Sequence, residues 1–583
     1  MKKRHAIMLL LIMTGCLVFF FLSGPAMIVD SLKNKLRPTG QSTGFSDDVV
    51  FDGSHYKLSH ALLEKNDTVY FSLRDLENIL SIHRVKKGDT LSISFKGRSL
   101  TYQNGELANV QSDEIQPYLE KHGTIYLPGS HLEKFLGINI DFYLHKKTHT
   151  VALSSPEEQQ KPPIEQNIGA SLFLHKRDVP RSPYEPRNGL YAGGYVLQDE
   201  HIQTSMEKFN SLTGKQHASF FKYVGYGKPF PKKWVAGVKQ AGGFPQIAWE
   251  PNNGLDEVKD DAYLLQFAKE AAKADVPVLL RYASEMNGTW TFYSGHAKQY
   301  IEKWRLVHEV MKANAPNVMM LWNVFTMPEK TIKEFYPGDE YVDYVGVNIY
   351  NVVYHNDQVQ EKADFEDPLH LLDYVYNTFS ARKPIVIGEF GASNYTTTDG
   401  RHHTKFAEEK ISRMYRLLPK LYPRVKFIYY FDVNNLVNAP EGRKINNYAI
   451  TENKHILNAY ANAVKDPAYL STIAQNDRVS DAETFTYRDF MFRYEEKLYV
   501  DASFVKDYLG MQTAKGSDSS HLQLIYNGKT ASFRTEKHQI DKAAFFEKRA
   551  LTGLPIIEIL EAFHIKYEHK DGDLHIWEDT LIQ

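Results

Sequence analysis

Between about residues 167 and 467, short apolar runs alternate with amphipathic stretches, and this alternation constrains the fold more than any other feature of the chain. The apolar runs are residues 190–196, 218–224, 245–249, 276–281, 318–324, 342–349, 384–388 and 425–431. The stretches between them include residues 256–273, 296–314, 368–379 and 403–421, where apolar residues recur at helical spacing. Strands that alternate with helices pair in parallel.

Eight strand–helix units in a region of roughly 250–300 residues match the size of a (β/α)8 barrel. The main alternative is an open, doubly wound sheet, which would carry a glycine-rich nucleotide loop after its first strand. Gly193 and Gly194 lie at the first run but do not form such a loop. The sequence therefore predicts a central TIM barrel in residues 171–467.

Four segments outside the barrel resemble one another, because each places a short apolar strand directly before a short amphipathic helix. They are residues 68–80, 124–137, 497–510 and 551–563. A stretch of alternating apolar and polar residues, which is typical of a strand, follows each segment. We therefore predict two copies of one small, internally doubled α+β domain, at residues 48–155 and 480–583.

This strand–helix pattern resembles the stalk-like domain named after the N-terminal region of copper amine oxidases, which is common in exported bacterial proteins. The resemblance implies a spacer or a module that contacts the cell wall. It does not imply copper, because His55, His60, His83 and His122 are scattered and lack the spacing of metal ligands. We expect no metal site.

The first 30 residues are predicted to be a signal peptide or a signal anchor. Lys2, Lys3 and Arg4 precede an apolar stretch from about residue 6 to residue 22. The positive charges should stay in the cytoplasm, so the rest of the chain is expected outside, secreted or anchored in the membrane by this segment. Retention of the anchor is favoured. Residues 31–47 and 156–170 are polar and are predicted to be linkers.

The composition excludes two kinds of chemistry. The chain has 69 Lys and Arg against 71 Asp and Glu, so it offers no basic field for nucleic acid. Its one cysteine, Cys16, lies inside the apolar N-terminal stretch. The part after that stretch therefore has no thiol nucleophile and no cysteine metal site.

In a TIM barrel the reacting groups lie at the carboxyl ends of the strands. There the sequence places Tyr195, Tyr223, Tyr226, Trp249, Glu250, Glu285, Asn287, Asn323, Asn348, Tyr350, Glu389, Phe431 and Asp432. Carboxylates supply acid, base and nucleophile, flat rings stack on sugars, and amides bind hydroxyl groups. The rim therefore predicts a carbohydrate site, and no cofactor is required because two carboxylates suffice.

Two strand ends carry family motifs. On strand four, Arg281-Tyr-Ala-Ser-Glu-Met-Asn-Gly-Thr-Trp290 resembles the acid/base segment of glycoside hydrolase family 26. On strand seven, Pro384-Ile-Val-Ile-Gly-Glu-Phe-Gly391 resembles the nucleophile segment of that family. The segments that end strands three and six also match the character of the family.

The resemblance implies a clan A, mannanase-like enzyme with a retaining mechanism, in which Glu285 is the acid/base and Glu389 is the nucleophile. Retention predicts carboxyl groups about 5–5.5 Å apart. Burial beside a negative neighbour should raise the pKa of Glu285. The residues expected to bind substrate or support the pair are Arg281, Asn287, Trp290, Trp249, Trp322, Asn348, Tyr350, Phe431 and Asp432.

One departure from the family pattern leaves the polymer open. The best-known mannanases of the family have His directly before the acid/base, where this chain has Ser284. β-Mannan is the first expectation, with mixed-linkage β-glucan, β-xylan and a producer's own exopolysaccharide as alternatives. A non-catalytic carbohydrate-binding or wall-organising surface protein is the second hypothesis, and an exopolysaccharide transglycosylase is the third.

Overall fold

The computed structural model describes residues 45–578, except 53, 66–67, 109–115, 146–147, 161–163, 166–170, 476–479, 517, 519 and 542–547. The chain divides into two compact units. One holds residues 171–488 and those from 565 onward, and the other holds the described residues of 39–170 and 489–564. The predicted signal or anchor lies outside the described residues. Within the described part of the chain, no helix is both long enough and apolar enough to cross a membrane.

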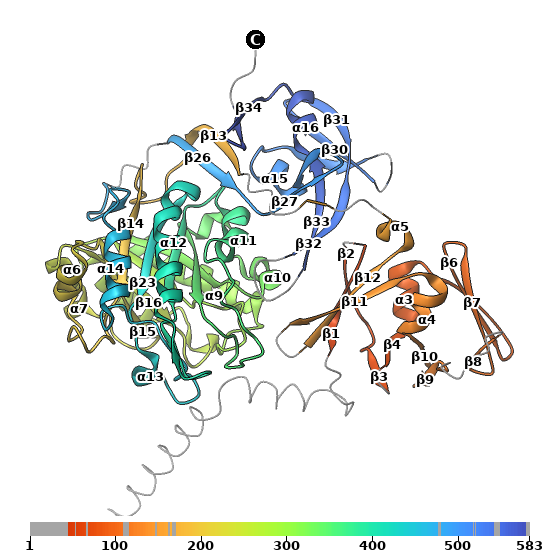
Figure 1. Cartoon of the computed structure of the whole chain (residues 1–583). Helices are drawn as coiled ribbons and strands as arrows, with labels where there is room; N and C mark the ends of the chain where they lie inside the picture. Colours follow the sequence, from red (N-terminus) through yellow and green to blue (C-terminus); the bar gives the residue numbers. More distant parts are fainter. Residues whose placement is uncertain are drawn as a thin grey trace, which may run out of the picture. The chain divides into compact units, whose positions relative to one another are not determined.

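A closed barrel of parallel strands forms most of the first unit (Figure 1). Its strands are β14 (Leu190–Tyr195), β15 (Ser219–Gly225), β16 (Phe244–Glu250), β17 (Val278–Tyr282), β18 (Val318–Phe325), β19 (Tyr344–Asn351), β20 (Ile385–Ala392) and β23 (Val425–Phe431). Each pairs with the next in chain order, and β14 pairs with both β15 and β23, which closes the ring. The predicted eight-stranded TIM barrel is confirmed.

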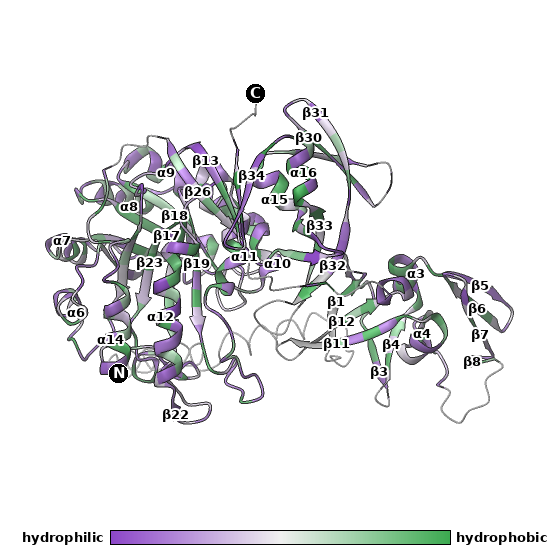
Figure 2. Cartoon of the chain, turned by 45° about the horizontal axis from the view of Figure 1, so that its top comes forward, coloured by the Kyte–Doolittle hydropathy of each residue, from purple (hydrophilic) through white to green (hydrophobic). Residues whose placement is uncertain are grey.

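Helices cover the outside of the barrel. They are α6 (Met206–Thr213), α7 (Lys232–Gln240), α8 (Ala262–Ala272), α9 (Ala297–Asn314), α10 (Glu329–Ile332), α11 (His370–Phe379), α12 (Thr404–Leu421) and α14 (Lys454–Ala463). In α12 the buried residues include Ala407, Ile411, Met414 and Leu418, which share one face. Figure 2 shows this helix banded by polar and apolar residues.

One helix starts later than the sequence indicates. Residues 256–273 read as a single helix, but α8 begins at Ala262 and is preceded by a short 3-10 turn, Leu255–Glu257. The reason is a helix cap, because the Asp261 side chain accepts a hydrogen bond from the backbone N–H of Leu264.

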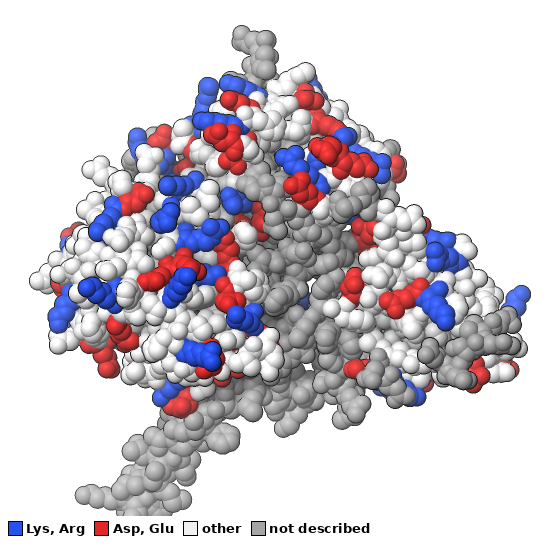
Figure 3. All heavy atoms as spheres, viewed as in Figure 1, with Lys and Arg blue, Asp and Glu red and all other residues white. Residues whose placement is uncertain are grey.

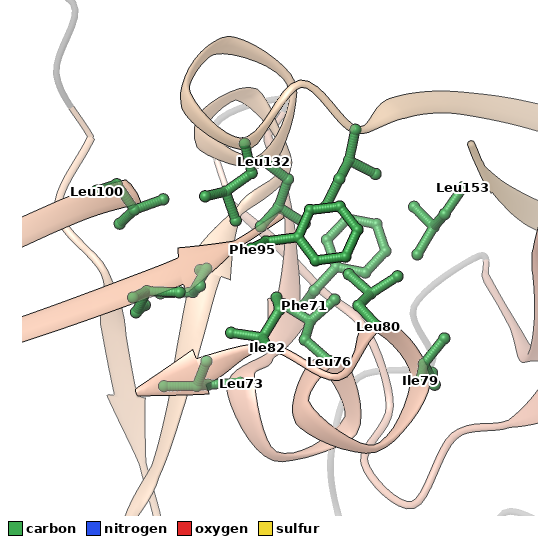
Figure 4. Close-up of a cluster of buried hydrophobic side chains, with 14 of the residues drawn as sticks. Phe71, Leu73, Leu76, Ile79, Leu80, Ile82, Phe95, Leu100, Leu132 and Leu153 are labelled. Atoms are coloured by element: carbon green, nitrogen blue, oxygen red, sulfur yellow. The ribbon is translucent and has the colours of Figure 1, made fainter. Parts of the chain in front are cut away.

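Residues 45–154 form an α+β copy in which a strand runs twice into a short helix. Its elements are β1 (Phe45–Phe51), β2 (Ser54–Lys57), β3 (Leu63–Lys65), β4 (Thr68–Ser72), α3 (Leu73–Leu80), β5 (His83–Lys87), β6 (Thr90–Phe95), β7 (Arg98–Gln103), β8 (Glu106–Leu107), β9 (Leu119–Lys121), β10 (Thr124–Pro128), α4 (Gly129–Leu136), β11 (Asn139–His145) and β12 (Thr148–Ser154). Leu76 and Leu80 of α3 pack with Phe71, Leu132 and Leu153 in one core (Figure 4).

A second set of elements repeats this order. It consists of β26 (Asp481–Tyr487), β27 (Met491–Tyr494), β28 (Lys497–Asp501), α15 (Ala502–Asp507), β29 (Gln512–Lys515), β30 (His521–Tyr526), β31 (Lys529–Arg534), β32 (Glu536–Asp541), β33 (Lys548–Pro555), α16 (Ile556–Ala562), β34 (Lys566–Lys570) and β35 (Asp573–Trp577). The sheet order β3-β4-β10-β9 of the first copy recurs as β27-β28-β33-β32. The predicted strand–helix pairs therefore form in both copies.

The first strand of the second copy precedes the barrel. The sheet β11-β12-β1-β2 recurs as β34-β35-β13-β26, where β13 is Leu172–Val179. Both sheets have the same sequence of antiparallel, parallel and antiparallel pairs. The predicted barrel, residues 171–467, includes β13. The hydrogen bonds of β13, however, run to β26 and β35 and not to a barrel strand. The barrel is thus inserted between the first two strands of the second copy.

A buried ionic cluster ties β26 to the start of β23. Glu483 of β26 accepts from Lys426 Nζ at 3.0 Å, and Arg424 Nη1 lies 3.6 Å from the same carboxylate. Arg424 also pairs with Glu185 at 2.5 Å. On the face shown in Figure 3, positively and negatively charged side chains are interspersed over the described residues.

Candidate active site

Glu389 lies at the carboxyl end of β20 and is almost fully buried. Three donors hold its carboxylate. Arg281 Nη2 lies 2.5 Å from Oε1, the Tyr223 hydroxyl also donates to Oε1, and the Tyr350 hydroxyl donates to Oε2. These contacts fix the orientation of the carboxylate, and the guanidinium balances its charge.

Glu285 occupies a tight turn after β17. Its φ is +59° and that of Ala283 is +45°, in the left-handed region that non-glycine residues rarely adopt. The turn is held because Glu285 N donates to Asn323 O at 3.0 Å and Ala283 N donates to Trp249 O at 3.0 Å. Strain of this kind is often found where a side chain must be aimed at a reacting group.

The Glu285 carboxyl receives two hydrogen bonds, from Trp290 Nε1 to Oε2 at 2.7 Å and from Asn348 Nδ2 to Oε1 at 2.6 Å. Burial, and secondarily the charge of Glu389, raises the pKa of Glu285 to about 7. Both hydrogen bonds act in the opposite direction, because they favour the charged form. The result is a carboxyl group that can give or take a proton near neutral pH.

Asn348 and Arg281 connect the two glutamates. Asn348 Oδ1 lies 3.5 Å from Arg281 Nη1, while the other nitrogen of the same guanidinium contacts Glu389. A continuous path therefore runs from Glu285 through Asn348 and Arg281 to Glu389. The structure places both carboxyl groups at one mouth of the barrel, as the sequence predicts.

Two glycines make room for the amides behind this path. A Cβ on Gly388 would lie 2.2 Å from Asn323 Oδ1 and 2.8 Å from Asn348 Oδ1, and a Cβ on Gly346 would lie 2.3 Å from Asn323 Oδ1. Asn323 Nδ2 in turn donates to Asn348 Oδ1 at 2.9 Å. Since atoms cannot approach so closely, the amide pair requires glycine at both positions.

A third carboxylate, Glu250 at the end of β16, holds the turn that carries Glu285. It accepts from Ser284 Oγ at 2.5 Å, from Ser284 N at 3.1 Å and from the Tyr293 hydroxyl at 2.7 Å. Burial raises the pKa of Glu250. Ser284, at the position where the best-known mannanases of family 26 have His, thus helps to fix the turn that carries Glu285.

The structure brings five of the predicted supporting residues to the pair. Arg281, Asn348, Tyr350 and Trp290 contact a glutamate directly, as described above. Phe431 lies edge-on to Tyr350, with ring centroids 5.6 Å apart. These residues and the two glutamates form the candidate active site.

The expectation that Trp249 and Trp322 stack on sugars is wrong. Both side chains are fully buried. Trp249 stacks on Phe267 of α8 at 4.0 Å, and Trp322 packs edge-on against Phe379 of α11 at 5.4 Å. Neighbouring residues of a strand point to opposite faces, and these two point outward into the helix layer.

The side chains of Asn287 and Asp432 are also hydrogen-bonded to backbone groups rather than to the two glutamates. The Asn287 amide donates to Phe325 O at 2.8 Å and accepts from Phe325 N at 2.9 Å, so it orders the end of β18. Asp432 is fully buried and accepts from Ile450 N at 2.8 Å. Burial, with the nearby charge of Asp199, raises the pKa of Asp432 well above its ordinary value.

Tyr223, Glu250, Asn323 and Tyr293 are neighbours of the two glutamates that were not among the predicted site residues. The first three lie at strand ends, which is a real but unspecific signal. Tyr293 lies in the loop after β17, where nothing in the sequence marks its contact with Glu250. All the groups at this site are acids, amides, an arginine and aromatic residues.

Residues 252–407 match the family model for Glycosyl hydrolase family 26. A curated relative, Endoglucanase H of Acetivibrio thermocellus, is 25% identical over 224 residues, which are 35% of this chain and 24% of that protein. The chain thus spans about a quarter of the length of this relative.

Solved structures of mannanases are also similar. A family 26 β-mannanase from Bacteroides ovatus is 15% identical, covers 49% of this chain and 90% of its own, and has a TM-score of 0.35. A Cellulomonas fimi endo-β-1,4-mannanase double mutant is 16% identical, covers 48% and 72%, and has a TM-score of 0.37. The barrel rests on the strand pairing described above and not on these scores. The matched residues 252–407 include strands β17 to β20 with both Glu285 and Glu389, and this part of the chain therefore carries the sequence pattern of glycosyl hydrolase family 26.

Proposed function

We propose that this protein is a retaining glycoside hydrolase that cleaves a β-linked polysaccharide, with Glu389 as nucleophile and Glu285 as acid/base. The observation that carries the proposal is the path of contacts from Glu285 through Asn348 and Arg281 to Glu389 at one barrel mouth. The family 26 match across the same strands supports it.

In the first step, protonated Glu285 gives its proton to the glycosidic oxygen while the Glu389 carboxylate attacks the anomeric carbon. The bond from that carbon to the leaving oxygen breaks, and a bond to a Glu389 oxygen forms. A pKa of about 7 keeps Glu285 protonated in mildly acidic solution and partly protonated at neutral pH. Arg281, Tyr223 and Tyr350 orient the attacking carboxylate.

In the second step, Glu285 is a carboxylate and takes a proton from water. The water oxygen attacks the anomeric carbon, and the bond to Glu389 breaks. Because Glu389 leaves as an anion, its contact with the Arg281 guanidinium favours this step. The two displacements restore both glutamates and return the original anomeric configuration.

A polymer is favoured over a free sugar because exposed apolar side chains lie on the loops around the mouth. Phe292 follows strand four and is 66% exposed, Phe365 follows strand six, and Val437 lies in the short helix α13 (Asn435–Asn438) of the connection after strand eight. Flat or apolar surfaces of this kind stack on successive sugar rings. We therefore expect endo action, with β-mannan first and β-glucan, β-xylan or an exopolysaccharide as alternatives.

The location outside the cell is part of the proposal. It rests on the basic and apolar residues of positions 1–30. The two α+β copies would act as spacers or wall contacts, by their resemblance to stalk domains. A fractionation experiment that recovers the full chain only in the cytoplasm would contradict this part alone.

The test combines a polysaccharide panel with chemical rescue. The full chain is incubated with mannan, mixed-linkage β-glucan and xylan, and the first-formed anomer is followed by NMR. Glu285→Ala and Glu389→Ala are each assayed with an activated aryl glycoside and azide. We expect a β-glycosyl azide from the first variant and an α-glycosyl azide from the second.

Glu302→Ala is the matched control, because Glu302 is an exposed glutamate on α9. It should keep wild-type turnover and give no azide product. Wild-type turnover in Glu389→Ala would refute the assignment. Binding of a polysaccharide without any hydrolysis would instead support the non-catalytic carbohydrate-binding alternative.

A further inference from the structure

The two oxygens of the Glu389 carboxylate are not equally occupied. Among the residues that the structure describes, Oε1 accepts from both Arg281 Nη2 and the Tyr223 hydroxyl, whereas Oε2 accepts only from the Tyr350 hydroxyl. Each carboxylate oxygen has about two lone-pair positions. The protein therefore fills both positions on Oε1 and leaves one position open on Oε2.

This count identifies the oxygen that can react. Attack on an anomeric carbon requires a lone pair that no hydrogen bond uses, and only Oε2 offers one. In the reaction the new bond joins Oε2 to the anomeric carbon, the bond to the leaving oxygen breaks, and Glu285 protonates that oxygen. Oε1 takes no part in bond formation and remains held by Arg281 and Tyr223.

Tyr223 is fixed where it stands. It lies on β15, its ring is 5.3 Å from the Arg281 guanidinium, and it packs edge-on against Tyr195 at 5.4 Å and Phe221 at 5.5 Å. The side chain is nevertheless 39% exposed. Tyr223 thus borders the open mouth, while its hydroxyl contacts the nucleophile.

In retaining glycosidases, hydrogen bonds to the sugar 2-hydroxyl strengthen in the transition state. An oxygen of the nucleophile that does not attack is the natural acceptor for that hydroxyl, because C2 adjoins the reacting carbon. We propose that Tyr223 is a specificity-determining residue that occupies this acceptor position on Oε1 in place of the substrate. The inference rests on the proposed hydrolase function and deepens it.

The consequence concerns the substrate class. Glucose and mannose differ only in the configuration at C2. An enzyme whose nucleophile accepts no hydrogen bond from the 2-hydroxyl therefore discriminates weakly between them. The site therefore accepts β-linked backbones with either configuration at C2. Replacing the 2-hydroxyl by a group that cannot donate a hydrogen bond therefore lowers kcat/KM of this enzyme only slightly.

The experiment compares the full chain with Tyr223→Phe on matched probes. The probes are 2,4-dinitrophenyl β-cellobioside and β-mannobioside, each with a counterpart that lacks the 2-hydroxyl on the ring bearing the aryl group. The measured quantity is the ratio of kcat/KM with and without that hydroxyl. Loss of Tyr223 frees one position on Oε1, and the ratio should rise at least about tenfold, the size of one hydrogen bond to a charged acceptor.

Tyr350→Phe is the control variant, since it removes a hydroxyl from the same carboxylate but at Oε2. It should lower kcat and leave the ratio as in the wild type. Circular dichroism checks that both variants are folded. If the wild type and Tyr223→Phe give the same ratio on a hydrolysed probe, the role of Tyr223 is refuted while the hydrolase function stands. If the wild type hydrolyses none of the probes and no polysaccharide, the proposed function fails and the inference fails with it.

Discussion

The Asn348 side chain donates from Nδ2 to Glu285 Oε1 at 2.6 Å and accepts at Oδ1 from Asn323 Nδ2 at 2.9 Å. Glu285, the proposed acid/base in the turn after strand four, is therefore positioned by strand six, which is in turn positioned by strand five. Gly388 of strand seven leaves the space in which these amides lie. Residues of strands four to seven thus act together to position the carboxyl group of Glu285.

A methyl group in that space should disable the enzyme. In Gly388→Ala the new Cβ would collide with Asn323 and Asn348, so the amides must move and Glu285 loses the hydrogen bond from Asn348. We expect kcat to fall by about a hundredfold, the typical cost of a displacement of about 1 Å at a reacting group. Steady-state kinetics on a hydrolysed polysaccharide measures the loss.

Gly237→Ala is the control for this substitution. Gly237 lies inside α7, and its Cβ would meet only Met206 Cε at 3.8 Å. Alanine there should preserve activity and stabilise the fold by about 1 kcal/mol through helix propensity. Equal activity losses in the two variants would mean that the amide pair is not the cause.

Activity should decline as the pH rises through about 7. The first step requires protonated Glu285, whose pKa is raised to about 7, so the protonated fraction falls above that pH. Trp290→Phe removes a hydrogen bond that favours the charged form, and the pKa must therefore rise further. The basic limb of the kcat/KM profile should move to higher pH in this variant.

The pH profile of kcat/KM, measured from about pH 5 to 9, checks this prediction because it reports the free enzyme. A basic limb that stays in place in Trp290→Phe, or moves to lower pH, would show that another group governs it. Thr289→Ala, which changes the adjacent and exposed residue, serves as the control.

Substitution of Glu250 should lower kcat more than it changes KM. Its carboxylate is taken by Ser284 and Tyr293, so it positions the turn of Glu285 and does not face the substrate. Glu250→Ala should lower kcat about a hundredfold and leave KM within a factor of a few. Tyr293→Phe keeps both Ser284 contacts and should lose less. A raised KM with unchanged kcat would instead indicate substrate contact.

The buried ionic cluster should matter for stability and not for chemistry. Glu483→Ala leaves Lys426 and Arg424 without a shared anion in a buried site, which costs about 3–5 kcal/mol. Urea unfolding of the barrel measures the difference. Glu441→Ala removes an exposed partner of Lys444 and should cost about 1 kcal/mol at most. A neutral Glu483→Ala would mean that water reaches the cluster.

The barrel strands and the positions of the two glutamates could be predicted because their signals are local. Each strand is a continuous apolar run, and each glutamate lies within a short motif at a strand end. The exposure of strand-end aromatics could not be predicted in the same way. Trp249 and Glu250 are neighbours, yet the first packs on α8 and the second holds the active-site turn. A register error of one residue reverses such an assignment.

Contacts across long sequence separations are the other part that the sequence does not reveal. The Tyr223 hydroxyl meets a carboxylate 166 positions further along the chain. The membership of β13 in a sheet with β26 and β35 is hidden for the same reason, because the barrel lies between the paired segments. Only the closed fold brings these residues together.

The insertion of the barrel between β13 and β26 has a mechanical consequence. The chain enters and leaves the barrel through two hydrogen-bonded antiparallel strands, about 4.8 Å apart. Tension applied between the two ends of the chain is first carried by the parallel ladder that joins β13 to β35, and this ladder must shear before the antiparallel pair of β13 and β26, and then the barrel, is loaded. A protein held at one end and pulled at the other would thus keep its two glutamates in register while the flanking sheet bears the force.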